Sequence, residues 1–257
     1  MQTGGSCADN DVIPPTHSNI LTCTPIRRPV PNINALHAYV TKRRGNTVFT
    51  LSYTWSKALT EANSYNDGGD AAEKSSRHFN YGPASFDRRQ LFVGTYTYRI
   101  PLFRGSKGVV GGTFKGWELS GITRVQTGGF LTPTGSSTGI TRRSQYTGGD
   151  VALSSDLRCV DHWFNTTAFT NAPTDAIGNA GVGVIQGPGW RNWDLSLRKV
   201  FRIREGWSLR FQADAFNFMN HANFGNPNVS TSGGGSYGTI SSSQPARNIQ
   251  FGARVTF

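Results

Sequence analysis

The chain has 257 residues, of which 36% are hydrophobic, 12% aromatic and 16% charged. Abundant aromatic residues and 31 glycines suit strands joined by flexible loops better than a helical bundle. The low share of charged residues argues against a disordered chain kept open by charge repulsion. The net charge of +11 comes from scattered lysines and arginines without a nucleic-acid-binding motif, so we expect no nucleic-acid partner.

The N-terminal segment, residues 1–34, is expected to be a loop or irregular structure. Its first ten residues are polar and lack the basic start and apolar stretch of a signal peptide. No run of about 18 apolar residues occurs, so no membrane-spanning helix is expected. Cys7 and Cys23 could form a disulfide, which would leave Cys159 unpaired. Three unrelated thiols fit the sequence equally well.

Four strands are predicted in the first half of the chain, because apolar and polar residues alternate there. The first two, at about 35–42 and 47–57, flank residues 43–46, whose Gly-Asn pair suits a tight hairpin turn. The next two are expected at 90–100 and 115–127. The apolar faces of the last three of these strands carry Phe49, Leu51, Tyr53 and Trp55, then Phe92, Tyr96, Tyr98 and Ile100, then Trp117, Leu119 and Val125.

Three further strands follow, with the clearest alternation in the chain. They are predicted at 193–201, 207–215 and 249–257. Lys199 interrupts the apolar positions of the first of them, whereas every odd position of the second is apolar. Residues 204–206, with the sequence Arg-Glu-Gly, are typical of a hairpin turn between these two strands.

Short and long connections alternate along this predicted meander. The shorter links are at 43–46, 101–112 and 204–206, and the long loops are at about 60–88, 128–190 and 220–247. Transmembrane β-barrels show this asymmetry, with short periplasmic turns and long external loops, and a tilted strand of about 9–11 residues crosses the bilayer. The sequence therefore predicts an all-β fold, an antiparallel transmembrane β-barrel portion of about seven strands, over residues 35–257.

In such a barrel the apolar face of each strand meets lipid and the polar face lines the lumen. The predicted luminal residues include Arg198, Arg210, Gln212, Asp214 and Arg254. Tryptophans near the strand ends, typical of an aromatic girdle, are Trp55, Trp117, Trp193 and Trp207. An odd strand count with two unpaired edges does not suit a closed barrel in hydrocarbon, so we expect an incomplete barrel, a piece of a longer protein.

Several segments resemble the TonB-dependent outer-membrane receptors, most closely their Oar-like group. They are residues 187–199 (GPGWRNWDLSLRK), 210–224 (RFQADAFNFMNHANF), 50–59 (TLSYTWSKAL) and 86–89 (FDRR). Their order along residues 35–257 is more specific than any one of them. The resemblance implies a barrel of about 22 strands around a plug. It also implies ligand uptake driven through the TonB system, which the missing N-terminal parts of the full-length protein would contact.

The C-terminal strand is the candidate signal for the barrel-assembly machinery. Barrels of this class commonly end in an aromatic residue on an alternating strand, and here the alternate positions are Phe251, Ala253, Val255 and Phe257. The predicted partners are therefore outer-membrane lipid, the assembly machinery and the TonB system. The outer membrane is the predicted location.

Other functions are weighed against this interpretation. The glycines of 181–187 lack the spacing of a nucleotide loop, and residues 66–70 lack the helices and glutamate of an EF-hand. No metal-ligand, nucleophile or triad motif is found, so no catalytic site, cofactor or enzyme activity is expected. The alternatives that remain are a surface adhesin or structural barrel without transport, and a secreted β-rich carbohydrate-binding module. Ligand contacts are expected in the three long loops.

Overall fold

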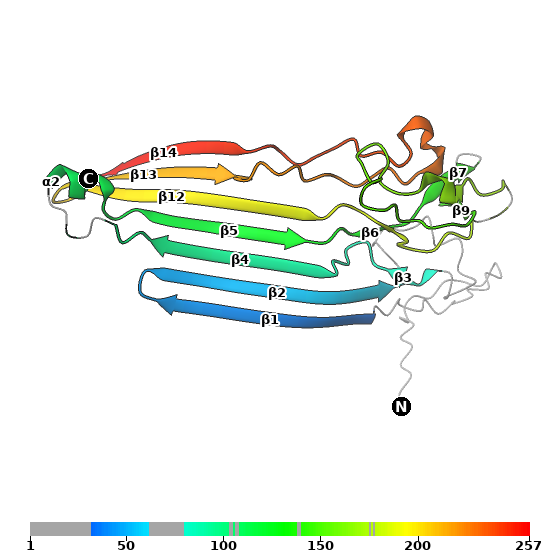
Figure 1. The fold of residues 1–257 in the computed structure, drawn as a ribbon, viewed down its shortest axis with the longest axis horizontal. Helices are drawn as coiled ribbons and strands as arrows, with labels where there is room; N and C mark the ends of the chain where they lie inside the picture. The colour runs from blue at the N-terminus through cyan, green and yellow to red at the C-terminus, as the bar shows by residue number, and fades with distance from the viewer. Residues whose placement is uncertain are drawn as a thin grey trace, which may run out of the picture.

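A computed structural model describes residues 32–61, 80–102, 105, 108–137, 140–174, 176 and 178–257. Seven long strands form one antiparallel meander, in the order β1-β2-β4-β5-β12-β13-β14, and a short strand β3 pairs with the end of β2 (Figure 1). The strands are β1 Asn32–Arg44, β2 Thr47–Thr60, β3 Gly82–Pro83, β4 Gln90–Arg99, β5 Glu118–Gln126, β12 Trp190–Arg204, β13 Trp207–Phe216 and β14 Asn248–Thr256. The predicted all-β, antiparallel, incomplete barrel is confirmed, because this sheet does not close on itself.

Two strands begin earlier than the alternation indicated. β1 starts at Asn32, inside the segment predicted to be irregular, and β12 starts at Trp190. The first residues of β1 include Asn32 and Asn34, whose polar side chains fall on the otherwise apolar side and hide the pattern. Backbone pairing with β2 from Asn32↔Leu59 onward extends the strand nonetheless.

The connections separate into two ends of the sheet. At one end, called the turn end, lie the links β1–β2, β4–β5 and β12–β13 together with the C-terminus, and at the other, the loop end, lie the long loops (Figure 1). Gly45 and Gly206 make the two tight turns with φ of +61° and +78°, a left-handed conformation that glycine adopts without steric cost. The predicted alternation of short and long connections is thereby confirmed.

The strand register places most of the large apolar residues of the seven strands on one side, called the apolar face. Side chains alternate across a strand, so residues paired across the sheet share a side. Pairs such as Leu51↔Gly94, Tyr98↔Leu119 and Leu197↔Ala213 carry the face from strand to strand. It ends on β14, where Leu209↔Val255 and Phe211↔Ala253 continue it. The opposite side, called the polar face, carries mainly Thr, Ser, Gln, Asp and Arg.

Lys199 is a charged residue on the apolar face, and the β4–β5 link covers it. This link contains a short helix, α2 Gly108–Phe114, and folds back over the end of the sheet (Figure 1). The Lys199 side chain is only 2% exposed, and its Nζ donates to the backbone oxygens of Thr113 (2.6 Å) and Lys115 (2.8 Å). The rings of Trp117 and Phe201 lie 5.6 and 4.6 Å from the ammonium group. The charge is thus withdrawn from the surface of the face.

No helix among the described residues is long and apolar enough to cross a membrane.

The tryptophans near strand ends lie at two levels. Trp117 and Trp207 are at the turn end, where β5 and β13 begin, and Trp207 packs against the ring of Phe257 at 5.3 Å. Trp55 and Trp190 lie toward the loop end: Trp55 is paired with Gln90, the first residue of β4, and Trp190 with Gln126, the last residue of β5. Trp193, predicted to be near a strand end, lies inside β12, because this strand starts at Trp190, earlier than expected.

We expect a charge to be tolerated on one face of β12 and not on the other. Leu197 lies mid-strand on the apolar face, and Ser196 beside it lies on the polar face. Leu197→Arg should lower the free energy of unfolding by about 2–4 kcal/mol, the usual cost of arginine at the bilayer midplane, and Ser196→Arg should change it little. Guanidinium titration of the protein folded in phospholipid vesicles measures both. Equal losses in the two variants would contradict the assignment of faces.

Candidate functional site: the loop assembly

Beyond the loop end of the sheet, the described residues of 127–189 and 217–247 pack into one body, called the loop assembly (Figure 1). Its buried core consists of Phe164, Ala168, Phe169, Ala180 and Ile185, flanked by Leu131, Val151, Trp163, Val229 and Tyr237. The seven strands of the sheet, in contrast, keep many large apolar side chains exposed. The loop assembly is therefore held together as a water-soluble domain is, with about 1.5–3 kcal/mol from each large side chain buried.

Short backbone pairings fix the path of the first loop. β6 pairs with β11, β7 with β8 and β9 with β10, and the helical turn η2 leads into β10. These elements are β6 Phe130–Leu131, β7 Thr134–Ser137, β8 Ile140–Arg143, β9 Gln145–Tyr146, η2 Thr166–Ala168, β10 Phe169–Thr170 and β11 Ile185–Gln186. Asn165 caps η2, since its side-chain oxygen accepts from the Thr167 backbone N at 3.2 Å. The sequence predicted a loop here, and the structure shows that this loop contains short paired strands and a helical turn.

The second loop docks onto the first through its turn η3, Thr231–Ser236, and the residues after it. The Tyr237 ring packs edge-on against Phe164 with centroids 5.4 Å apart. The backbone N of Trp163 donates to the oxygen of Gly238 at 3.0 Å. Two predicted ligand-contact regions, 128–190 and 220–247, are thus brought together into a single surface. In the third, 60–88, residues 62–79 lie outside the described part of the chain.

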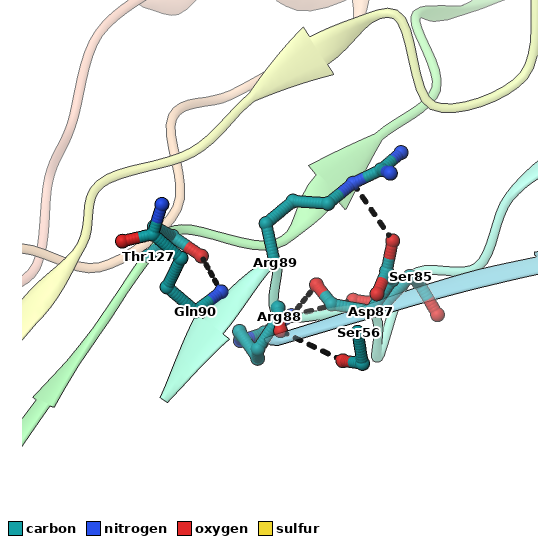
Figure 2. A network of polar contacts seen from close by, with 7 residues as sticks. All are labelled: Ser56, Ser85, Asp87, Arg88, Arg89, Gln90 and Thr127. Atoms are coloured by element: carbon teal, nitrogen blue, oxygen red, sulfur yellow. Dashed lines mark hydrogen bonds and ion pairs between the residues drawn. The ribbon is translucent and has the colours of Figure 1, made fainter. Parts of the chain in front are cut away.

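The FDRR segment forms a clip between the sheet and the loops (Figure 2). Asp87 is 2% exposed and pairs with Arg89 at 3.1 Å between Oδ2 and Nε. The Arg88 side chain turns back to donate to the backbone oxygen of Ser85 at 2.9 Å. Ser56 on β2 donates twice to this segment, from Oγ to the Arg88 backbone oxygen at 3.0 Å and from its backbone N to the Arg89 oxygen at 3.1 Å. These contacts fix the direction in which the chain enters β4.

Glycines let the loop assembly close down onto this clip. The Arg89 guanidinium stacks on the Phe130 ring, 4.9 Å from its centroid, at the start of the first loop. A side chain at Gly129 would come within 2.2 Å of the Arg88 guanidinium, and one at Gly128 within 1.8 Å of the Gly187 backbone oxygen. The GPG of 187–189 and the Gly-Gly pair therefore cross in contact, a close approach that only glycine permits.

Three asparagines spaced three residues apart make the second junction with the sheet. Asn217 and Asn220 have φ of +49° and +51°, a conformation that asparagine tolerates better than most residues. The Asn217 side chain exchanges two hydrogen bonds with the backbone of His221, both 3.0 Å long. Asn223 does the same with the backbone of Arg191 on β12, at 2.7 and 2.9 Å. The resemblance included this segment, yet sequence reasoning did not identify these bonds.

A buried arginine ties the loops to the segment before β3. Arg143 is 1% exposed, and its guanidinium donates to the Asn80 side chain and, at 3.5 Å, to the Ala180 backbone oxygen. Near it, the Thr231 hydroxyl donates to the Asn171 side-chain oxygen at 2.5 Å. The surface so formed offers amide, hydroxyl and backbone groups on a fixed frame, which suits recognition by hydrogen bonds.

Other predicted positions are placed as follows. Phe251, Ala253 and Val255 lie at alternate positions of β14, and Phe257 follows directly after it. All four are exposed, and their role in assembly stays a prediction. Cys159 is an exposed free thiol in the loop assembly, whereas Cys7, Cys23 and residues 66–70 lie outside the described part. Within the described residues, no three His, Cys, Asp or Glu side chains gather as a metal site.

The polar face carries a hollow of about 410 Å³ midway along the strands. Hydroxyl groups of Thr50, Thr95 and Ser196 line it together with Asp194 and Asp214. Both carboxylates have partners: Asp194 accepts from the Asn217 backbone N at 2.9 Å, and Asp214 from the side-chain amide of Gln212 at 2.9 and 3.0 Å. The wall at this level is hydrogen-bonding and mildly acidic.

Comparison with known proteins gives one match. A family model described as an outer membrane beta barrel domain matches residues 3–250 of the chain. No curated protein and no solved structure matches it. The matched range spans the described sheet almost to the end of β14 together with the loop assembly.

Removing the Asn217 side chain should weaken the junction between β13 and the loops. Asn217→Ala loses three hydrogen bonds to backbone groups of His221 and Pro245 and places alanine at positive φ, so the free energy of unfolding should fall by about 2–3 kcal/mol. Denaturant titration of the full chain in octyl glucoside micelles measures this. Asn192→Ala, on the polar face of β12, is the control and should change stability by less than about 0.5 kcal/mol.

The loop assembly should loosen at alkaline pH through Tyr237. Burial raises the pKa of Tyr237 to about 12, and its buried hydroxyl has no hydrogen-bond partner among the described residues. Because the folded pKa exceeds the unfolded value of 10.0, the phenol's contribution is fully present below about pH 10 and is lost between pH 10 and about 12. Near-ultraviolet circular dichroism should show this transition in the wild type and a weaker one in Tyr237→Phe. An unchanged transition in the variant would show that other groups cause it.

Proposed function

We propose that this chain, which belongs to the outer membrane beta barrel domain family and lies in the outer membrane, contributes barrel wall and external loops to a TonB-dependent receptor. In that receptor the turn end faces the periplasm, the loop end faces the medium, and the polar face lines the lumen. The loop assembly is then the surface that a ligand meets first.

The observation that carries this proposal is the loop assembly itself. All three long connections leave the sheet at one end, and two of them share one buried core. Barrels whose loops serve only as links have no need of a packed body at the mouth. The segments that resemble TonB-dependent receptors are also in contact: FDRR meets the glycines of 128–129, which cross 187–189, and Asn223 binds Arg191.

A secreted carbohydrate-binding sandwich is disfavoured. A sandwich buries the apolar face of one sheet against a second sheet. Within the described part of the chain, only the α2 link covers the apolar face of the seven strands, and large side chains such as Leu36, Val40 and Phe251 on it are exposed. A surface adhesin or structural barrel fits the same wall, and only energy-dependent uptake separates it from a receptor.

Uptake can be tested in cells without knowing the ligand. The protein is produced from its own gene, and solutes removed from the medium are compared by mass spectrometry among the wild type, a deletion of this gene and a deletion of TonB. A receptor predicts that the same solutes stay in the medium in both deletions. Solute removal that is unchanged in the gene deletion, together with weaker attachment of cells to surfaces, would support the adhesin and contradict the receptor.

A further inference from the structure

We propose that the polar face at the turn end holds a binding site for a small anionic solute, one that carries phosphate or carboxylate groups. The site is formed by Arg198, Arg202, Arg210 and Arg254. It deepens the proposed function by naming the chemistry of the transported ligand, and in that respect it rests on the proposed function. The site itself needs only the barrel wall.

The strand register gathers five arginines in neighbouring rows of one face. Arg99 and Arg198 are both paired with Glu118, on either side of it. One row nearer the turn end, Arg210 stands directly opposite Arg254. Arg202, one row further, is paired with a serine and shares the same side.

Among the described residues, Glu118 is the one acidic side chain that forms an ion pair with this group. Glu118 accepts from Arg99 at 3.2 Å and, through its other oxygen, from Arg198. None of the ion pairs between described residues involves Arg202, Arg210 or Arg254. Five guanidinium groups and one carboxylate leave four positive charges without a counter-charge. The remaining carboxylates of the polar face, discussed above, lie in the rows toward the loop end and have their own partners.

Opposed arginines on adjacent strands cost stability unless an anion lies between them. Like charges directly opposite in an antiparallel pair repel. A guanidinium group offers a planar fork of N–H donors that matches the two oxygens of a carboxylate or phosphate. An oxyanion bound between Arg210 and Arg254 would attract both guanidinium groups and so offset their mutual repulsion.

A hollow of suitable size is present at the same place. It has a volume of about 800 Å³ and lies where the α2 link meets the end of β12. Three arginines of the proposed site, Arg198, Arg202 and Arg210, line it together with Glu118. Lys199 and Phe201 of the apolar face and Lys115 of the α2 link also line it, and Arg254 lies outside it. Small-molecule sites have volumes of about 300–1,000 Å³. Rings of arginine and lysine are also how pores select anions. The size and the charge therefore indicate a small solute rather than a long acidic polypeptide.

The test is calorimetric titration of the full chain, folded in octyl glucoside micelles, with sodium pyrophosphate and with citrate. Because this detergent carries no phosphate or charge, the added anion is the only candidate ligand. The double variant R210Q/R254Q should bind pyrophosphate at least ten times more weakly than the wild type. The matched control R44Q/R124Q removes two positive charges from β1 and β5, outside the proposed site, and should bind within twofold of the wild type. Far-ultraviolet circular dichroism checks that both variants are folded.

Each other outcome overturns the site. Equal weakening in both double variants would mean that net charge alone attracts the anion, and absence of saturable binding to either probe would mean that there is no site. Tighter binding of an octaglutamate peptide than of pyrophosphate, lost in R210Q/R254Q, would assign the surface to an acidic polypeptide. The measurement contains no TonB, so anion binding that persists when uptake proves independent of TonB would refute the receptor and leave the site standing.

Discussion

Backbone hydrogen bonding in a medium without water is the constraint on which this structure depends. Hydrocarbon offers no partner to a free N–H or C=O group, so a strand that crosses it must be paired along its length on both sides. The five inner strands of the sheet meet this requirement, whereas β1 and β14 each keep one free edge. In a membrane these edges need strands to pair with, and a closed barrel supplies them. The same ladder fixes the register, and the register sends every second side chain to lipid.

Departures from this alternation show how strictly it is kept. Lys199 falls on the apolar face, where the β4–β5 link covers it. Two backbone carbonyls and two aromatic rings surround its ammonium group. Without such partners an ammonium group in an apolar medium costs several kcal/mol. At the other end of the sheet the alternation stops where left-handed asparagines and crossing glycines begin. The strands therefore end where backbone geometry, and no longer lipid, determines the path.

The sheet could be predicted from the sequence because its signal is local. Period-two alternation and the Gly-containing turns at 45 and 206 lie within a few residues of one another, so strand order follows from chain order. The loop assembly could not be predicted, because Phe164 meets Tyr237 and Arg143 meets Asn80 across long separations that leave no periodic trace. The arginine site is intermediate: the luminal positions of Arg198, Arg210 and Arg254 follow from alternation, but their gathering around Glu118 follows only from the register.

The sheet and the loop assembly are stabilised by different forces, so a change in one part need not destabilise the other. The loop assembly buries its core away from water, where the hydrophobic effect acts fully. The apolar face gains nothing comparable by association in lipid, since the surrounding chains are equally apolar. The two parts meet only at narrow junctions, the clip at Asp87–Arg89 and the asparagines near β13. Loops attached in this way can change in sequence while the wall, with its charged rows at the turn end, stays the same.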